Sequence, residues 1–128
     1  MRIEHFAIYT TDLERLRQFY MTYFNAGCNQ GYYNDKTGLR TYFLTFDCGS
    51  RLEIMSRPEV LVQNNKTKYM TGYTHLAFSV GSRENVDRLT HDLENAGYVI
   101  TDRPRTTGDG YYESVILDPD GNFIEITA

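Results

Sequence analysis

The chain has no tryptophan, only two cysteines and no long run of apolar residues. No stretch approaches the roughly 18 apolar residues of a membrane-spanning helix, and no secretory h-region follows Met1. Cys28 and Cys48 form no C-x-x-C motif, so two free thiols are expected rather than a disulfide or a redox pair. These absences favour a soluble protein, with the cytoplasm as its default location.

Positive charge is also scarce. Thirteen Lys and Arg against seventeen Asp and Glu give a net charge of −4 and a pI near 5.3, which argues against a nucleic-acid partner. A length of 128 residues with 41% hydrophobic and 23% charged content fits one compact domain. The aromatic content consists of eleven Tyr and seven Phe, and tyrosine suits the partly wet wall of a binding cleft.

The chain contains one pattern twice. His5 begins the string HFAIYT and His75 begins HLAFSV. Glu53 lies in the string LEIMS, and Glu125 lies in IEITA. A histidine and a glutamate, both metal-ligand types, thus occupy matching places in the two halves.

The first half reads as βαβββ. The sequence Thr11-Asp12-Leu13-Glu14 has the form of a capping box at a helix start, and Gly27 is placed to end that helix in a left-handed conformation. Alternating apolar residues and turn residues indicate the strands. Strands are predicted over residues 2–9, 29–34, 40–47 and 51–56.

The second half repeats this order after a polar linker over 57–72. Ser82 is the expected N-cap of a helix that stops at Gly97. Strands are predicted over 73–80, 98–101, 111–117 and 123–127. The expected fold is α+β: two βαβββ modules, about 1–56 and 73–128, form one domain over 1–128 with a curved, mixed, mostly antiparallel eight-stranded sheet around a metal-binding cleft.

Strand alternation separates the four repeated polar residues from their apolar neighbours. A glutamate in the middle of an apolar strand needs a partner, because an unpaired buried charge is costly. Two imidazoles and two carboxylates suit a divalent Zn, Ni, Co, Mn or Fe ion, with positions left for water or substrate. The predicted metal ligands are His5, Glu53, His75 and Glu125. The alternative is a relic of such a site in a metal-free binding protein.

The two His-x-Ala strings, the two glutamate strings and the sequence DPDGN over 118–122 resemble the vicinal oxygen chelate superfamily. That superfamily contains glyoxalase I, extradiol dioxygenases, fosfomycin-resistance enzymes, methylmalonyl-CoA epimerase and bleomycin-binding proteins. The resemblance covers essentially the whole chain. Its order His, Glu, His, Glu is similar to glyoxalase I, which implies that the same four residues bind one divalent metal ion.

The resemblance also implies a reaction. A metal-dependent lyase or isomerase of the glyoxalase I type would bind a small oxygen-chelating substrate of the α-hydroxy carbonyl kind. Glu125 would move a proton between adjacent carbons, and Glu53 would remain a ligand or assist on the other face. Glyoxalase I commonly has Arg and Asn where this chain has Tyr9 and Arg57, which argues against glutathione hemithioacetal as the substrate.

Further substrate-binding residues are expected near residues 102–110, which read as a loop. This loop would either close over the cleft and offer Arg105 to an anionic substrate, or be an ordinary hairpin connection. Tyr111, Tyr112 and Glu113 follow it, and by strand alternation one or two of them should face the cleft, as wall residues or as partners of a ligand.

Two other functions belong to the same resemblance. One is a metal-free protein that sequesters an antibiotic or another ligand in an aromatic cleft, as bleomycin resistance proteins do. The other is dioxygenase or thiol-transferase chemistry at the same metal, which Glu53 disfavours because those enzymes typically use two His and one Glu. A small molecule is the expected partner, and a homodimer is the expected assembly.

Overall fold

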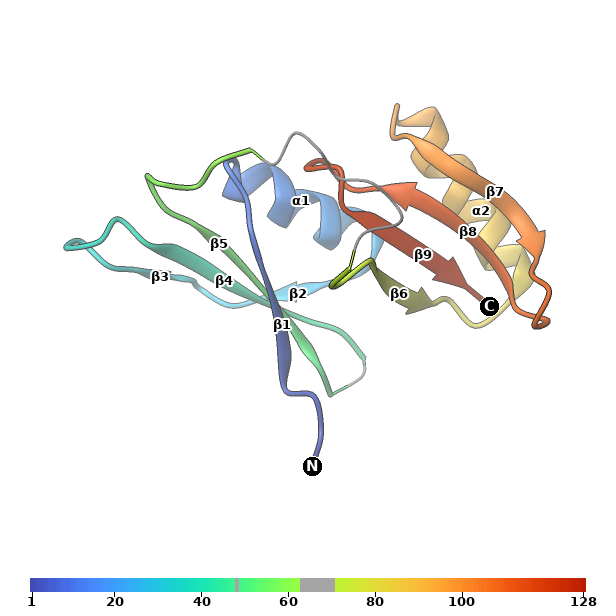
Figure 1. Ribbon diagram of the computed structural model, residues 1–128, viewed down its shortest axis with the longest axis horizontal. Coiled ribbons are helices and arrows are strands. Elements are labelled where there is room, and N and C mark those ends of the chain that lie inside the picture. The colour runs from blue at the N-terminus through green and yellow to red at the C-terminus, as the bar shows by residue number, and fades with distance from the viewer. Residues whose placement is uncertain (48, 63–70) are drawn as a thin grey trace. The chain divides into compact units, whose positions relative to one another are not determined.

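The computed structural model describes residues 1–47, 49–62 and 71–128. It divides the chain into two compact units, Met1–Asn64 and Asn65–Ala128. Each unit contains one sheet and one helix that packs on it (Figure 1). Across the described residues, none of the helices is long and apolar enough to cross a membrane.

The first unit places its N-terminal strand beside its last one. The strand order is β1-β5-β4-β2, with β3 also paired to β4 (Figure 1). β1 runs parallel to β5, and the other pairs are antiparallel. The elements are β1 (His5–Tyr9), α1 (Leu13–Tyr23), β2 (Gly27–Cys28), β3 (Tyr32–Tyr33), β4 (Arg40–Thr45) and β5 (Arg51–Ser56). Two short strands, β2 and β3, thus replace the single strand predicted over 29–34.

The second unit repeats this topology with the order β6-β9-β8-β7, in which β6 runs parallel to β9. Helix α2 packs on β7, β8 and β9 (Figure 1). The elements are β6 (His75–Ser79), α2 (Arg83–Asn95), β7 (Ile100–Thr106), β8 (Tyr112–Leu117) and β9 (Phe123–Thr127). The α+β class and the two βαβββ modules are confirmed, and their strands are described as two sheets, one in each unit.

The ends of α2 follow the prediction, and the ends of α1 do not. Ser82 caps α2 by accepting from the N–H of Asn85, and Gly97 has the left-handed φ of 89° that ends it. In α1 the cap is Asp12, not Thr11, and the left-handed residue after the helix is Asn25, with φ 51°, not Gly27.

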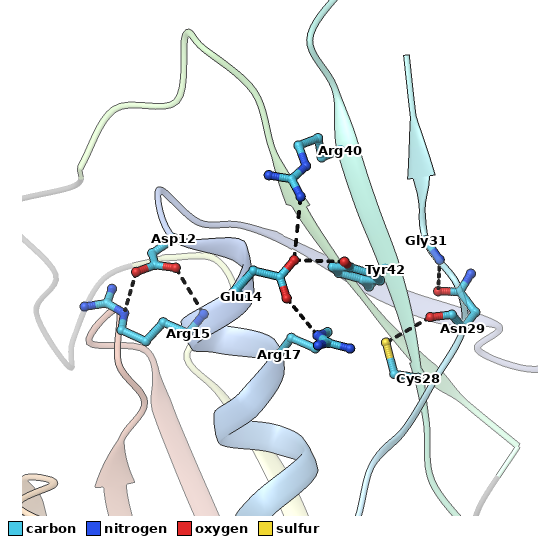
Figure 2. A network of polar contacts seen from close by, with 9 residues as sticks. All are labelled: Asp12, Glu14, Arg15, Arg17, Cys28, Asn29, Gly31, Arg40 and Tyr42. Carbon is cyan, nitrogen blue, oxygen red and sulfur yellow. Dashed lines mark hydrogen bonds and ion pairs between the residues drawn. The ribbon is translucent and has the colours of Figure 1, made fainter. Parts of the chain in front are cut away.

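Glu14 explains why the predicted capping box of α1 does not form. Its carboxylate accepts a hydrogen bond from the Tyr42 hydroxyl at 2.8 Å and from Arg17 at 3.0 Å, and it pairs with Arg40 at 3.6 Å (Figure 2). These contacts join α1 to β4. The Glu14 carboxylate is therefore engaged in tertiary contacts and does not bond the backbone N–H that a capping box would use.

The predicted loop over 102–110 is wrong for its first half, because β7 continues to Thr106. Pro104 lies inside this strand, which is possible because β7 is the edge strand of its sheet. The pairing of β7 with β8 shifts register between Asp102 and Arg105, on either side of the proline. Arg105 is therefore fixed in a paired strand and does not lie on a mobile lid.

Period-two alternation gives each sheet one apolar face. In β5, Leu52 and Ile54 are buried on the face covered by α1, and in β9, Ile124 and Ile126 are buried on the face covered by α2. Glu53 and Glu125 alternate with these residues, so both carboxylates project from the opposite face of their sheet. The fold thus leaves one face of each sheet for polar chemistry.

One polar pair lies inside the second core. Thr90 and Ser114 are buried, and their hydroxyl oxygens are 2.6 Å apart. Thr90 donates its own proton to the Val86 carbonyl at 2.7 Å, so Ser114 is the donor between the two hydroxyls. This bond fixes α2 to β8.

We expect Thr90→Val to lower the free energy of unfolding by about 1–3 kcal/mol, because it leaves the buried Ser114 hydroxyl without this acceptor. Removing both hydroxyls in Thr90→Val/Ser114→Ala should cost less than the sum of the two single changes. Urea denaturation of the four proteins measures this coupling. Additive losses would show that the hydroxyls do not interact.

Candidate functional site

The first predicted pair of ligands comes together on the polar face of the first sheet. β1 and β5 are parallel with Ala7 opposite Glu53, which places His5 two residues away on the same face. The distance from His5 Nε2 to Glu53 Oε2 is 3.8 Å. The Glu53 side chain is 17% exposed and that of His5 is 40% exposed. Both groups are therefore partly shielded but accessible.

The second unit reproduces this arrangement. Ala77 lies opposite Glu125 between β6 and β9, and His75 Nε2 lies 3.6 Å from Glu125 Oε2. The exposed fractions of the Glu125 and His75 side chains are 21% and 44%. The structure thus brings together each histidine and the glutamate of its own unit, in two equivalent pairs.

Both histidines also have a contact at their other ring nitrogen, which the sequence prediction missed. Glu4 Oε2 lies 2.5 Å from His5 Nδ1, and Thr74 Oγ1 lies 3.0 Å from His75 Nδ1. The hydrogen bond to His5 lowers the pKa of the Glu4 carboxyl, and Arg51, which also bonds Glu4, acts in the same direction. The sequence offered one sign of these contacts, because in both repeats a side chain that can form a hydrogen bond immediately precedes the histidine.

Phe43 supports the first pair from β4, where it stands opposite Glu53. Its ring meets that of His5 edge-on, with centroids 5.6 Å apart. The guanidinium of Arg51 lies 4.1 Å from the centroid of the same ring. The Phe43 ring thus holds the His5 imidazole by an edge-on contact and the Arg51 guanidinium by a cation–π contact.

A pocket of about 110 Å³ adjoins the second pair. Its walls come entirely from the second unit and combine polar residues with two apolar ones. They are Thr74, His75, Arg105, Glu113, Val115, Phe123 and Glu125. Of the predicted substrate-binding residues, Arg105 and Glu113 therefore lie beside a predicted metal ligand.

Glu113 is the least exposed carboxylate in this pocket. Burial raises its pKa, and repulsion from Glu125 raises it further. Arg105 acts in the opposite direction, but its nitrogen is 3.4 Å from the Glu113 oxygen, a long contact. The pocket therefore holds two carboxylates and one weakly engaged guanidinium, a charge distribution that a cation would relieve.

We expect Glu113→Gln to stabilise the metal-free chain at pH 7 by a few tenths to about 1 kcal/mol, because it replaces a carboxylate that is mostly shielded from water and that repels Glu125. The pKa of Glu113 is higher in the folded chain than in the unfolded chain. The contribution of Glu113 to the stability of the fold is therefore favourable below the ordinary glutamate pKa, where the carboxyl is protonated, and it is lost as the pH rises through the raised pKa. The gain should therefore vanish near about pH 3.5.

Urea titrations at both pH values test this expectation. Glu59→Gln is the control, because Arg57 lowers the pKa of that exposed carboxyl, and its loss should not stabilise the chain at pH 7. A Glu113→Gln protein less stable than the unaltered one at pH 7 would contradict the prediction.

The other three predicted substrate-binding residues are not among the residues that line this pocket. Tyr9 is exposed at the end of β1 and interacts with Arg57, whose Nε donates to Glu59 at 2.7 Å. That bond raises the pKa of the guanidinium, and Tyr9 contributes in the same direction. Tyr111 is exposed at the hairpin after β7, where its carbonyl accepts from the N–H of Thr107 at 2.8 Å.

A metal ion can be tested against the donors of each unit. In the part of the chain that the structure describes, no group of three or more His, Cys, Asp or Glu residues could hold one. Each predicted pair supplies one nitrogen and one oxygen donor, separated by 3.8 Å in the first unit and 3.6 Å in the second. Two donors at about 2.1 Å from one metal ion lie about 3.0–3.4 Å apart. Each pair is therefore close to the spacing of two ligands, and its nitrogen and oxygen donors fit a transition-metal dication.

Among the residues that the structure describes, the remaining cysteine and histidine give no further candidate for a site. Cys28 is a free thiol that donates to the Asn29 carbonyl at 3.3 Å (Figure 2), and the other predicted free thiol, Cys48, lies outside the described residues. His91 is exposed on α2 and bonds the Asn95 amide at 2.9 Å, so it is a surface residue, as expected.

Comparison with protein families settles the classification. The family described as the Glyoxalase/Bleomycin resistance protein/Dioxygenase superfamily matches residues 2–126. The chain belongs to this superfamily. The resemblance expected from the repeated strings is thereby confirmed.

The individual proteins that we compared with this chain each share 28% sequence identity or less with it. The protein YqjT of Bacillus subtilis, described as uncharacterized, is 28% identical over 129 residues, which are 98% of each chain. A glyoxylase/bleomycin resistance protein/dioxygenase domain from Frankia sp. EAN1pec has a TM-score of 0.82 and 18% identity, over 99% of this chain and 96% of that one. Glyoxalase I from Zea mays has a TM-score of 0.79 and 22% identity over 98% of this chain. The chain spans 44% of the maize protein, and at such identities these structures establish the fold.

Proposed function

We propose that this member of the superfamily is a divalent-metal-dependent lyase or isomerase resembling glyoxalase I. The metal ligands would be His5, Glu53, His75 and Glu125. The observation that supports the proposal is the equivalence of the two pairs, in which a strand histidine faces a strand glutamate at 3.8 and 3.6 Å. One pair alone has too few donors, so we propose that two pairs share one ion. They would come from the two halves of one chain or from two chains of a homodimer.

Charge supports the same proposal. Two carboxylates neutralise a dication, which makes the ion tolerable in a partly shielded site. Two imidazoles and two carboxylates leave one or two positions for a substrate on a five- or six-coordinate ion. The ion would be Zn, Ni, Co, Mn or Fe.

The protein groups would divide the chemistry between them. When bound, the ion supplies Lewis-acid polarisation of a substrate carbonyl oxygen. Glu125 would accept a proton from the neighbouring carbon and return it to the adjacent one, because its carboxylate is in the pocket of the second unit. Glu53 would remain a ligand or serve the opposite face. Val115 and Phe123 would exclude water from one wall of the pocket.

The substrate we propose is a small α-hydroxy carbonyl compound that chelates through neighbouring oxygens. Arg105 would bind an anionic group on it, because its guanidinium is only weakly engaged by Glu113 at 3.4 Å. Glutathione is not the favoured carrier. Tyr9 is uncharged, and Arg57 is already bound by Glu59 at 2.7 Å, so neither offers a free fork for a glutathione carboxylate.

The direct test is turnover of a panel of hemithioacetals formed from methylglyoxal with glutathione and with smaller thiols. We expect turnover that a chelator abolishes and that one of the five metals restores, with no preference for glutathione. Turnover that survives complete chelation would contradict the proposal. Tight, chelator-insensitive binding of an aromatic drug without turnover would instead identify a metal-free binding protein.

A further inference from the structure

The two proposed histidine ligands differ at the ring nitrogen that faces away from the glutamate pair. Glu4 Oε2 is 2.5 Å from His5 Nδ1, whereas Thr74 Oγ1 is 3.0 Å from His75 Nδ1. In both repeats the contact comes from the residue immediately before the histidine. The two halves therefore place a contact at the same position, but one half uses a carboxylate and the other a hydroxyl.

A carboxylate and a hydroxyl have different consequences for an imidazole. An ionised carboxylate only accepts hydrogen bonds, so a neutral histidine must present Nδ1–H to it. Its proton is then absent from Nε2, which keeps a lone pair. A hydroxyl both donates and accepts, and it is compatible with either tautomer. Glu4 therefore selects one form of His5, and Thr74 selects neither form of His75.

The Glu4 carboxylate is itself held in place. Its Oε1 accepts a hydrogen bond from the Arg51 guanidinium, which lies 4.1 Å from the centroid of the Phe43 ring. The backbone carbonyl of Glu4 accepts from the Arg51 N–H at 3.0 Å. The His5 ring meets the same phenylalanine edge-on at 5.6 Å. Although Glu4 is exposed, its orientation toward His5 is thus fixed by contacts of both its backbone and its side chain.

We propose that Glu4 is a positioning residue that orients the His5 ring so that its neutral form carries the proton on Nδ1 and keeps Nε2 free to bind the metal beside Glu53. The purpose of this arrangement depends on the function proposed above, but the tautomer is a property of the metal-free chain. A hydrogen-bonded carboxylate behind an imidazole both orients the ring and makes its ligating nitrogen more basic. The histidine of the first unit is therefore held in the form that binds a metal ion, whereas that of the second unit is not.

The tautomer is measured by long-range ¹H–¹⁵N NMR of the imidazoles in the metal-free protein. A pH of about 8.5 keeps histidines of ordinary pKa neutral, and the N-terminus should carry no tag because Glu4 lies so close to it. We expect His5 to be protonated on Nδ1 in the unaltered chain and to become a mixture of tautomers in Glu4→Gln. The glutamine amide, like the threonine hydroxyl, both donates and accepts.

Two matched variants control the measurement. Thr74→Val should alter the signals of His75 and leave those of His5 unchanged. Glu59→Gln removes an exposed carboxylate that is bound to Arg57, and should leave both tautomers unchanged. Proton occupancy of Nε2 in unaltered His5, or an unchanged His5 in Glu4→Gln, would overturn the inference.

Zn²⁺ affinity, measured by competition with a chromophoric chelator, gives the second readout. Loss of an outer-shell partner typically weakens a metal site by 10–100-fold, on the order expected for Glu4→Gln. Thr74→Val should have a smaller effect, and Glu59→Gln none. Equal losses in Glu4→Gln and Thr74→Val would overturn the preference for the first half. If the unaltered chain binds none of the five metals but the tautomer shifts as expected, the role of Glu4 in orienting His5 stands and the proposed function fails.

Discussion

Replacing Glu125 with glutamine is expected to weaken metal binding by more than about 100-fold and to abolish turnover. Outer-shell changes alone cost 10–100-fold, so loss of a charged ligand should cost more. The substitution keeps the shape of a side chain that is 21% exposed and 3.6 Å from His75, so its effect is on charge and coordination rather than on packing. Chelator competition gives the affinity, and turnover of the hemithioacetal panel gives the activity.

Glu53→Gln is the matched variant, because the same change is made in the equivalent pair of the other unit. It should weaken metal binding to a similar extent, but at saturating metal it should keep more activity, since Glu125 is the proposed base. This difference separates ligation from proton transfer. If both variants kept the metal affinity of the unaltered chain, the assignment of the ligands would be wrong.

Truncating Phe19 to alanine is expected to lower the free energy of unfolding by about 3–5 kcal/mol. Phe19 is 2% exposed and lies among three other aromatic rings of the first unit, with ring centroids 5.1–5.6 Å away. Its removal leaves a cavity under α1, which packs on β4 and β5. Because β5 carries Glu53, the same change should also loosen the first pair.

Urea denaturation followed by circular dichroism measures the loss. Met21→Ala is the control on the same helix, because its side chain is exposed and its removal should change stability by less than about 0.5 kcal/mol. Similar losses for the two variants would mean that Phe19 is not part of the core on which the first sheet depends.

The modules were predictable because their signals are local and occur twice. Alternation around Glu53 and Glu125 identified the inner strands, and Ser82 and Gly97 marked the ends of α2 correctly. The errors arose where a tertiary contact overrode a local signal. Glu14 bonds Tyr42 and Arg40 and does not close a capping box.

The extent of β7 was missed for a similar reason. Asp102, Arg103, Pro104 and Arg105 have the composition of a loop, and only the position of β7 at the sheet edge allows them to form a strand. Which strand lies at the edge of the sheet depends on the order of the strands, which cannot be read from local sequence patterns. The consequence for the site is that Arg105 has a fixed place beside Glu113.

The two His–Glu pairs were predictable because the repeat and the period of two place both members on one face of a sheet. Their supporting residues were not. Phe43 comes from another strand, and the contact of Glu4 with the His5 ring depends on side-chain direction. The one sequence feature that indicates these contacts is the matching position of Glu4 and Thr74, each directly before a histidine.

The measurement that tests the metal site most directly is the number of metal ions per chain. Elemental and native mass spectrometry would be applied to protein purified without an affinity tag, beside His5→Gln and His75→Gln. The shared site predicts close to one ion per chain, lost from both variants although each changes only one unit. Two ions per chain lost independently, or no ion in the unaltered protein after incubation with each metal, would contradict it.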